Sequence, residues 1–309
     1  MKPFAAPLTL VALTSILPEL LSGNTPLEAL LGFPLLLFLF AYGLPVLLIR
    51  ELAVRRDTGH FGLFLMGLGY GLINEGLYAR TIFRDVDVPV DVFDHYGFAL
   101  GINWPWTAFI CVWHAMASVW LPIALTERHF AQRTPWFGRW AYCGLGVTTL
   151  LSGSAFFLLV GQSATEAELG HVENEPVMLA ALWVVILAVW VAGSLQRRRT
   201  DSPSDRRALS VLIGLTGAPA FIVCAIPADQ RWPLALSFAA LILLAALYTL
   251  AFRFLRLNAA WFALGWYIQI AALSWTAIAM ASPLTVVADL LILGMVFLTI
   301  RHPSQGAIQ

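Results

Sequence analysis

Charged residues are scarce in this chain. Only 12% of its 309 residues are Asp, Glu, Lys or Arg, whereas 60% are hydrophobic. Soluble domains carry about 25% charged residues, so the composition excludes an ordinary soluble protein and predicts one that crosses a membrane several times. The formal net charge is zero, which gives no electrostatic reason to expect a nucleic-acid partner.

Cysteine is also rare, and the three residues are Cys111, Cys143 and Cys224. All lie within apolar runs and are too far apart for a zinc knuckle, so we expect inert packing thiols and no disulfide. The sequence lacks internal repeats, the clearest sequence indication of an inverted-repeat transporter. Because no connection between apolar runs is long enough for a soluble domain, residues 1–309 are expected to form a single integral-membrane domain.

Long apolar runs, by contrast, are abundant. About ten segments have the length and hydropathy of membrane-spanning helices, which need ~20 apolar residues. These segments lie at 5–22, 28–50, 60–83, 104–126, 139–161, 176–196, 207–227, 232–252, 259–279 and 283–301. Pro18 and Glu19 interrupt the first, so a re-entrant or interfacial piece is the alternative to a retained first helix. The predicted fold is an all-α polytopic membrane helix bundle with about ten transmembrane helices.

The basic residues divide the loops between these segments into two classes. When the loops are numbered alternately, one side receives nearly all of them, which marks the cytoplasmic face. The basic side holds Lys2, Arg50, Arg55, Arg56, Arg128, Arg133, Arg139, Arg197, Arg198, Arg199, Arg206, Arg207, Arg253, Arg256 and Arg301. The acidic residues of the other side are Asp85, Asp87, Asp91, Asp94, Glu166, Glu168, Glu173, Glu175 and Asp229. We therefore expect a multi-pass protein of the cytoplasmic (inner) membrane, with both termini cytoplasmic and membrane lipid as its surroundings.

The segment 60–83 differs from the other apolar runs because it contains Asn74, Glu75 and Arg80. Glycines at 62, 67, 69, 71 and 76 leave much of its surface without side chains, which lets a neighbouring helix come close. A carboxylate at this depth costs roughly 2.5 kcal/mol or more unless it faces the protein interior or water. We therefore expect a central helix with its polar side inward and a functional role for Glu75. A carboxylate that only fixes helix packing is the alternative.

Three further ionisable groups, Glu19, His114 and Asp289, fall within the predicted spans. At a rise of ~1.5 Å per residue, Glu75, His114 and Asp289 lie roughly 12, 15 and 9 Å from the outer ends of their helices. All are therefore in the outer half of the membrane. An outer loop joins the spans of Glu75 and His114, so we expect these two side chains to meet. A packing histidine is an equal alternative for His114, and structural roles are favoured for Glu19 and Asp289.

Helical spacing refines this picture. His114 and Ser118 are four residues apart and share a helix face. Arg80 follows Glu75 by five residues and points away from it, so an ion pair within the helix is not expected. We expect the Arg80 side chain to extend to the outer surface instead.

The stretch Asn74–Arg80, Asn-Glu-Gly-Leu-Tyr-Ala-Arg, with His114 in the next span, resembles the CAAX-protease and bacteriocin-processing (CPBP) family of intramembrane proteases. That family carries Glu-Glu-x-x-x-Arg and, on a later helix, Phe-x-x-x-His. With Glu75 as the first acid, Arg80 falls at the motif spacing and Gly76 replaces the second acid. With Glu75 as the second acid, Asn74 replaces the first and Arg80 lies one residue beyond the motif spacing. The family's third motif, a His followed by Asn or Asp, has its nearest counterpart in His171.

The resemblance implies a catalytic set of Glu75, His114, Arg80 and Asn74. Glu75 would activate a water and His114 would assist it, while Arg80 would be the motif arginine. The substrate class that it implies is a membrane-embedded peptide.

The chemistry leaves several functions open. Peptide hydrolysis needs a water, a base that deprotonates it, and donors for the oxyanion. A metal-assisted version needs about three protein ligands, which Glu75, His114 and Asp289 would supply to a divalent cation if their helices converge. The alternatives are a proton-coupled small-solute transporter that titrates Glu75 and Asp289, and a non-catalytic subunit that assembles with other membrane subunits.

Overall fold

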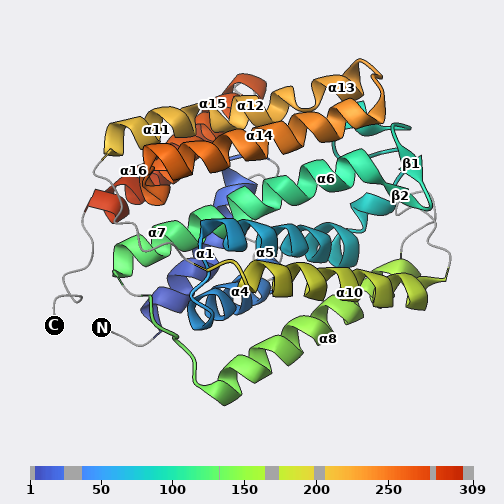
Figure 1. Ribbon diagram of the computed structural model, residues 1–309, viewed down its shortest axis with the longest axis horizontal. Helices are drawn as coiled ribbons and strands as arrows, with labels where there is room; N and C mark the ends of the chain where they lie inside the picture. Colours follow the sequence, from blue (N-terminus) through green and yellow to red (C-terminus); the bar gives the residue numbers. More distant parts are fainter. Residues whose placement is uncertain are drawn as a thin grey trace.

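The computed structural model describes residues 4–23, 37–131, 133–163, 174–197, 206–278 and 283–301, and this part of the chain is almost entirely helical. Four helices lie side by side in the order α14 (Leu234–Leu255), α6 (Trp104–Trp113), α5 (His60–Leu72) and α10 (Glu175–Ser194), as Figure 1 shows. Helix α8 (Arg139–Ser163) lies beyond α10 in the same view.

The other elements complete the bundle. The remaining α-helices are α1 (Ala5–Leu20), α4 (Leu44–Arg55), α7 (Leu121–Phe130), α11 (Arg207–Leu215), α12 (Gly217–Val223), α13 (Ile226–Asp229), α15 (Ala259–Ile278) and α16 (Pro283–Arg301). The π-helical segments are η1 (Leu39–Gly43), η2 (Ile73–Tyr78) and η5 (His114–Trp120), and the 3-10 turns are η3 (Thr81–Phe83) and η4 (Asp91–Phe93). Strands β1 (Phe98–Ala99) and β2 (Ile102–Asn103) form a short antiparallel hairpin before α6.

Five helices of the described part are long and apolar enough to cross a membrane. They are Trp104–Phe130, Arg139–Leu159, Glu175–Ser194, Arg207–Asp229 and Leu234–Leu255. Each overlaps one of the predicted spans from 104–126 to 232–252, so the prediction of an all-α, multi-pass membrane protein is confirmed. The total of ten is not confirmed. The apolar helix Ala5–Leu20 is shorter than a full span, and part of the predicted span 28–50 lies outside the described residues.

The predicted span 60–83 does not continue as one straight helix. Helix α5 passes into η2, and the chain then turns at Arg80, whose φ of +56° is left-handed. Thr81–Phe83 follow as a 3-10 turn. A left-handed residue other than glycine ends a right-handed helix at a steric cost. The turn therefore shortens this helix at its C-terminal end.

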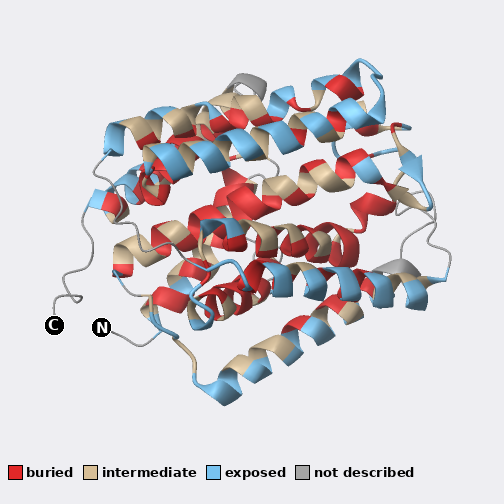
Figure 2. Cartoon of the chain, in the orientation of Figure 1, coloured by how far each residue is buried: buried red, intermediate tan, exposed pale blue. Residues whose placement is uncertain are grey.

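Glycines let α5 approach its neighbours at backbone distance. A Cβ atom on Gly67 would lie 2.6 Å from the Cα of Ala115, and one on Gly71 would lie 2.6 Å from the Cα of Cys111. No side chain fits into such a gap, as the small-residue pattern of this segment predicts. Figure 2 shows the result, with buried residues concentrated in the central helices and exposed faces on α8, α10 and α14.

A buried ion cluster lies at the end of α4, where the sequence predicts a cytoplasmic loop. Arg50 and Glu51 are both fully buried, and Arg50 Nη1 lies 3.0 Å from Glu51 Oε1. Arg50 Nη1 also donates to the carbonyl of Thr134 at 2.8 Å, and its guanidinium carbon lies 3.5 Å from the ring centre of Trp136. Glu127 adds a second carboxylate, 3.5 Å from Arg50 Nε. Arg50, which the sequence places on the basic side, is therefore buried inside the protein, where these partners compensate its charge.

Candidate functional site

Three π-helical segments supply the central side chains of the candidate site. Segment η1 contains Tyr42, η2 contains Glu75, and η5 begins with His114. A π-helical turn contains one residue more than an α-helical turn and is rare in proteins. Where such turns do occur, they are frequently found at functional sites. Three such segments meet around one cluster of polar side chains, which makes this cluster the strongest candidate in the described part of the chain.

Glu75 and His114 are in direct contact. Glu75 Oε1 lies 2.9 Å from His114 Nε2, and the two residues are only 8% and 3% exposed. The close packing of α5 on α6 and η5, which Gly67 and Gly71 allow, brings them together. The site is therefore a buried acid–imidazole pair.

Each member of the pair has a second polar partner. The hydroxyl of Thr81 donates to Glu75 Oε2, and the hydroxyl of Ser118 lies 3.0 Å from His114 Nδ1. Thr81 in turn accepts a hydrogen bond from the indole N–H of Trp106 at 2.9 Å. The sequence reasoning missed Thr81 and Trp106, since their approach to Glu75 depends on the turn after η2.

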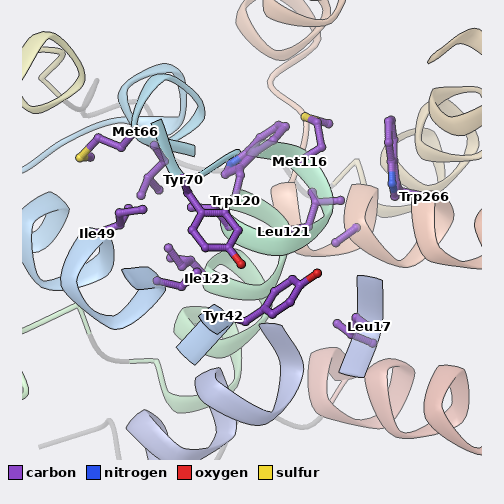
Figure 3. Packing of buried hydrophobic residues seen from close by; sticks show 14 of the residues in the cluster. Leu17, Tyr42, Ile49, Met66, Tyr70, Met116, Trp120, Leu121, Ile123 and Trp266 are labelled. Carbon is purple, nitrogen blue, oxygen red and sulfur yellow. The ribbon is translucent and has the colours of Figure 1, made fainter. Parts of the chain in front are cut away.

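Two tyrosines flank the His114 ring. The ring centre of Tyr70 lies 5.5 Å from that of the imidazole, and the ring centre of Tyr42 lies 6.0 Å from it. The ring centres of the two tyrosines are 5.8 Å apart, and Figure 3 shows both side chains within the buried cluster. The amide of Asn74 donates to the Tyr70 hydroxyl at 2.9 Å, and the Tyr42 hydroxyl donates to Glu19. Asn74 and Glu19 therefore reach the site through tyrosines. The spacing of four residues between Tyr70 and Asn74 is compatible with their contact, whereas nothing in the sequence indicates the contact between Tyr42 and Glu19.

Arg80 lies inside the protein and does not extend to the outer surface as predicted. Its side chain is 2% exposed, and Nη2 donates to Glu175 Oε1, on the first residue of α10, at 3.0 Å. The guanidinium carbon also lies 4.7 Å from the ring centre of Phe157 on α8. The turn at Arg80 directs its side chain between α8 and α10, where Glu175 neutralises the charge.

Asp289 has a different partner. Its Oδ2 accepts a hydrogen bond from the indole N–H of Trp275 at 2.8 Å. Among the described residues, no three His, Cys, Asp or Glu side chains gather closely enough to hold a metal ion. In this structure Asp289 therefore does not lie with Glu75 and His114, because it faces Trp275 of α15 instead. His171, the counterpart of the third protease motif, lies outside the described residues.

Comparison with known sequences adds one match. A family model described as an uncharacterized membrane protein family matches residues 8–307. No curated protein and no solved structure matches the chain. The family match agrees with the multi-pass helical structure, and it does not connect the chain with the CAAX-protease and bacteriocin-processing family. Because the match covers nearly the whole chain, this protein belongs to that uncharacterized membrane protein family.

Proposed function

We propose that this protein is an intramembrane hydrolase in which Glu75 and His114 form the general acid–base pair. The observation that carries the proposal is the 2.9 Å contact between Glu75 Oε1 and His114 Nε2 within the buried helical core. The resemblance to intramembrane proteases suggests the substrate class, which is a peptide bond in or near the membrane. The distribution of arginines supports an active site in the outer half of a cytoplasmic membrane, with both termini in the cytoplasm.

The hydrogen bonds around the pair define where a proton can reside. The Ser118 hydroxyl can donate to His114 Nδ1, so that His114 Nε2–H donates to an ionised Glu75. In the other tautomer, Nδ1–H donates to Ser118 and Nε2 accepts the proton of a neutral Glu75. The pair can therefore take up a proton and release it again without moving any heavy atom.

Hydrolysis of an amide would need the pair to take up a proton in one step and to release it in the next. Glu75 would remove a proton from a water whose oxygen attacks the carbonyl carbon. When the C–N bond breaks, the pair would return that proton to the leaving nitrogen. His114 would orient the water or stabilise the oxyanion. The Glu75 side chain retains 10% of its surface exposed, which supports the approach of a small molecule such as water.

The test is peptide cleavage by purified protein in proteoliposomes, followed in water enriched in heavy oxygen. Hydrolysis of a mixed library of apolar peptides must place one heavy oxygen in each new carboxyl terminus, and mass spectrometry detects it. We expect labelled products with wild type and with Asp289→Asn, which alters an intramembrane acid outside the pair. Glu75→Gln and His114→Ala should lose at least about a hundredfold in rate, the usual scale for general acid–base catalysis. Equal labelling with wild type and Glu75→Gln would overturn the proposal.

A second candidate is a proton-coupled carrier of small solutes. Glu19 favours it, because Glu19 accepts a hydrogen bond from Tyr42, whose ring centre lies 6.0 Å from the imidazole ring that Glu75 contacts. One acid in direct contact with the imidazole and a second linked through a tyrosine suit stepwise proton transfer. Proton uptake into proteoliposomes under an imposed solute gradient tests this function, and an absence of peptide hydrolysis together with Glu75-dependent proton movement would favour the carrier.

A further inference from the structure

We infer that Thr81 and Trp106 are positioning residues that restrict the catalytic proton of Glu75 to one of its two oxygens. This inference rests on the proposed function of the Glu75–His114 pair and deepens it. It assigns Oε1, the oxygen facing His114, as the proton-exchanging atom. It assigns Oε2 as a permanent hydrogen-bond acceptor.

The direction of the hydrogen bonds follows from the chemistry of the indole. Trp106 Nε1–H can only donate, and it lies 2.9 Å from Thr81 Oγ1. Thr81 Oγ1 therefore accepts at that contact. Its single hydroxyl hydrogen is free to point at Glu75 Oε2, which is the second partner of Thr81 Oγ1. The relay runs from Trp106 to Thr81 to Glu75, because Glu75 Oε2 is the acceptor that the Thr81 hydroxyl hydrogen meets in the described part of the chain.

The three members are buried, which shields the hydrogen bonds between them from the solvent. Trp106 is 2% exposed, Thr81 is 6% exposed and Glu75 is 8% exposed. A buried carboxylate oxygen that accepts a hydrogen bond from a hydroxyl is stabilised in its unprotonated form. A proton on that oxygen would point at the hydroxyl hydrogen and break the hydrogen bond. Proton uptake is therefore directed to Oε1, along the 2.9 Å line to His114 Nε2.

The fold holds both ends of the relay in place. The left-handed residue Arg80 reverses the chain after η2, so that Thr81 can reach back to Glu75, six positions earlier. At the other end, the side chain of Asn103 caps α6 by accepting from the backbone N–H of Trp106 at 3.1 Å. Asn103 also donates to the carbonyl of Phe93 at 2.9 Å, which ties the start of α6 to the outer loop.

Threonine 81 allows a matched pair of variants. Thr81→Val keeps the shape of the side chain and removes the hydroxyl, whereas Thr81→Ser keeps the hydroxyl. Thr126→Val is the control, because Thr126 is a fully buried threonine whose hydroxyl, within the described residues, donates to the carbonyl of Pro122 in its own helix. Trp106→Phe removes the first donor of the relay and leaves the hydroxyl of Thr81 free to rotate.

Two measurements separate this inference from the proposed function. The first is the carboxylate vibration of Glu75, isolated as the infrared difference from Glu75→Gln. We expect Thr81→Val and Trp106→Phe to shift it, and Thr81→Ser and Thr126→Val to leave it unchanged. The second is the heavy-oxygen peptide assay. Thr81→Val should lower kcat about tenfold to a hundredfold with KM unchanged, the scale of one hydrogen bond to a charged group, and Thr81→Ser should restore it.

The outcomes are distinct. An unchanged carboxylate band in Thr81→Val would overturn the relay, whatever the activity. A shifted band in a protein that hydrolyses no peptide would support the relay and count against the hydrolase. A fall in kcat that Thr81→Ser does not restore would show that residue 81 acts through packing rather than through its hydroxyl, and it too would overturn the inference.

Discussion

Arg80 Nη2 lies 3.0 Å from Glu175 Oε1, and this ion pair joins the turn after η2 to the first turn of α10. Arg80 is almost fully buried, while the Glu175 side chain is 33% exposed. The same arginine has the left-handed backbone that directs Thr81 toward Glu75. One residue therefore supports the candidate site in two ways, through its side chain and through its backbone.

Comparison of two variants separates these contributions. Arg80→Gly and Arg80→Ala both remove the ion pair, but only glycine adopts a left-handed conformation without steric cost. We expect Arg80→Ala to be less stable than Arg80→Gly by about 1 kcal/mol, the lower end of that cost. Denaturant unfolding in detergent micelles measures the difference. Equal stability of the two variants would show that the backbone at this position relaxes.

The glycines of α5 should tolerate no side chain where they face the next helix. In Gly67→Ala and Gly71→Ala the new methyl group would lie 2.6 Å from a backbone Cα. The two helices would have to separate, at a cost of about 1–3 kcal/mol. Separation would also lengthen the Glu75–His114 contact, so activity should fall together with the melting temperature.

Gly144→Ala is the control for this prediction. Apart from its own helix, no atom of the described residues lies within 4 Å of a Cβ built at Gly144 in α8, and alanine is the better helix former by about 1 kcal/mol. We expect this variant to be as stable as wild type or more stable. A loss equal to that of Gly67→Ala would contradict the packing explanation.

The ion cluster of α4 should depend on both of its charges. Glu51→Gln keeps the shape of the side chain but leaves the buried guanidinium of Arg50 with less negative charge nearby. Removing one partner of a buried ion pair costs roughly 3–5 kcal/mol. Thermal unfolding of purified protein should show a large drop. Asp57→Asn changes an exposed acid just after α4, and it should stay within about 0.5 kcal/mol of wild type.

Ser118 should control the tautomer of His114. Ser118→Ala removes the partner of Nδ1, which lies 3.0 Å away in wild type, and leaves a buried ring nitrogen unsatisfied. We expect a stability loss of about 1–3 kcal/mol and a change in the nitrogen-15 shifts of the His114 ring. Nitrogen shifts identical to those of wild type would show that Nδ1 finds another partner, and that Ser118 does not hold the tautomer.

Much of the membrane character could be predicted from composition and run length. Scarce charge and long apolar runs place the chain in a bilayer, where backbone hydrogen bonds must be satisfied within helices. Five of the predicted spans correspond to helices long enough to cross a membrane. The sequence also indicated that Glu75 and His114 could meet. Their depths in neighbouring spans follow from the rise per residue, which is a local property of a helix. Neither step required any knowledge of how distant segments pack.

Other features depend on contacts between distant segments, and the sequence could not show them. Nothing local signals that three π-helical segments converge, or that Arg80 takes a left-handed conformation. The places of Trp106, Glu175 and Asp289 follow from which helices pack together, since a side chain on an apolar helix can face lipid, a neighbour or the site with the same local pattern.

The sequence by itself therefore determined a helical membrane protein with an acid and a histidine at similar depth. Only the tertiary structure decided which groups surround that pair. It brought Thr81 and Ser118 to the pair, Tyr42 and Tyr70 to the imidazole ring, and Asp289 to Trp275. The physical reason is that these partners are selected by close packing between helices, which the chain specifies as a whole and not segment by segment.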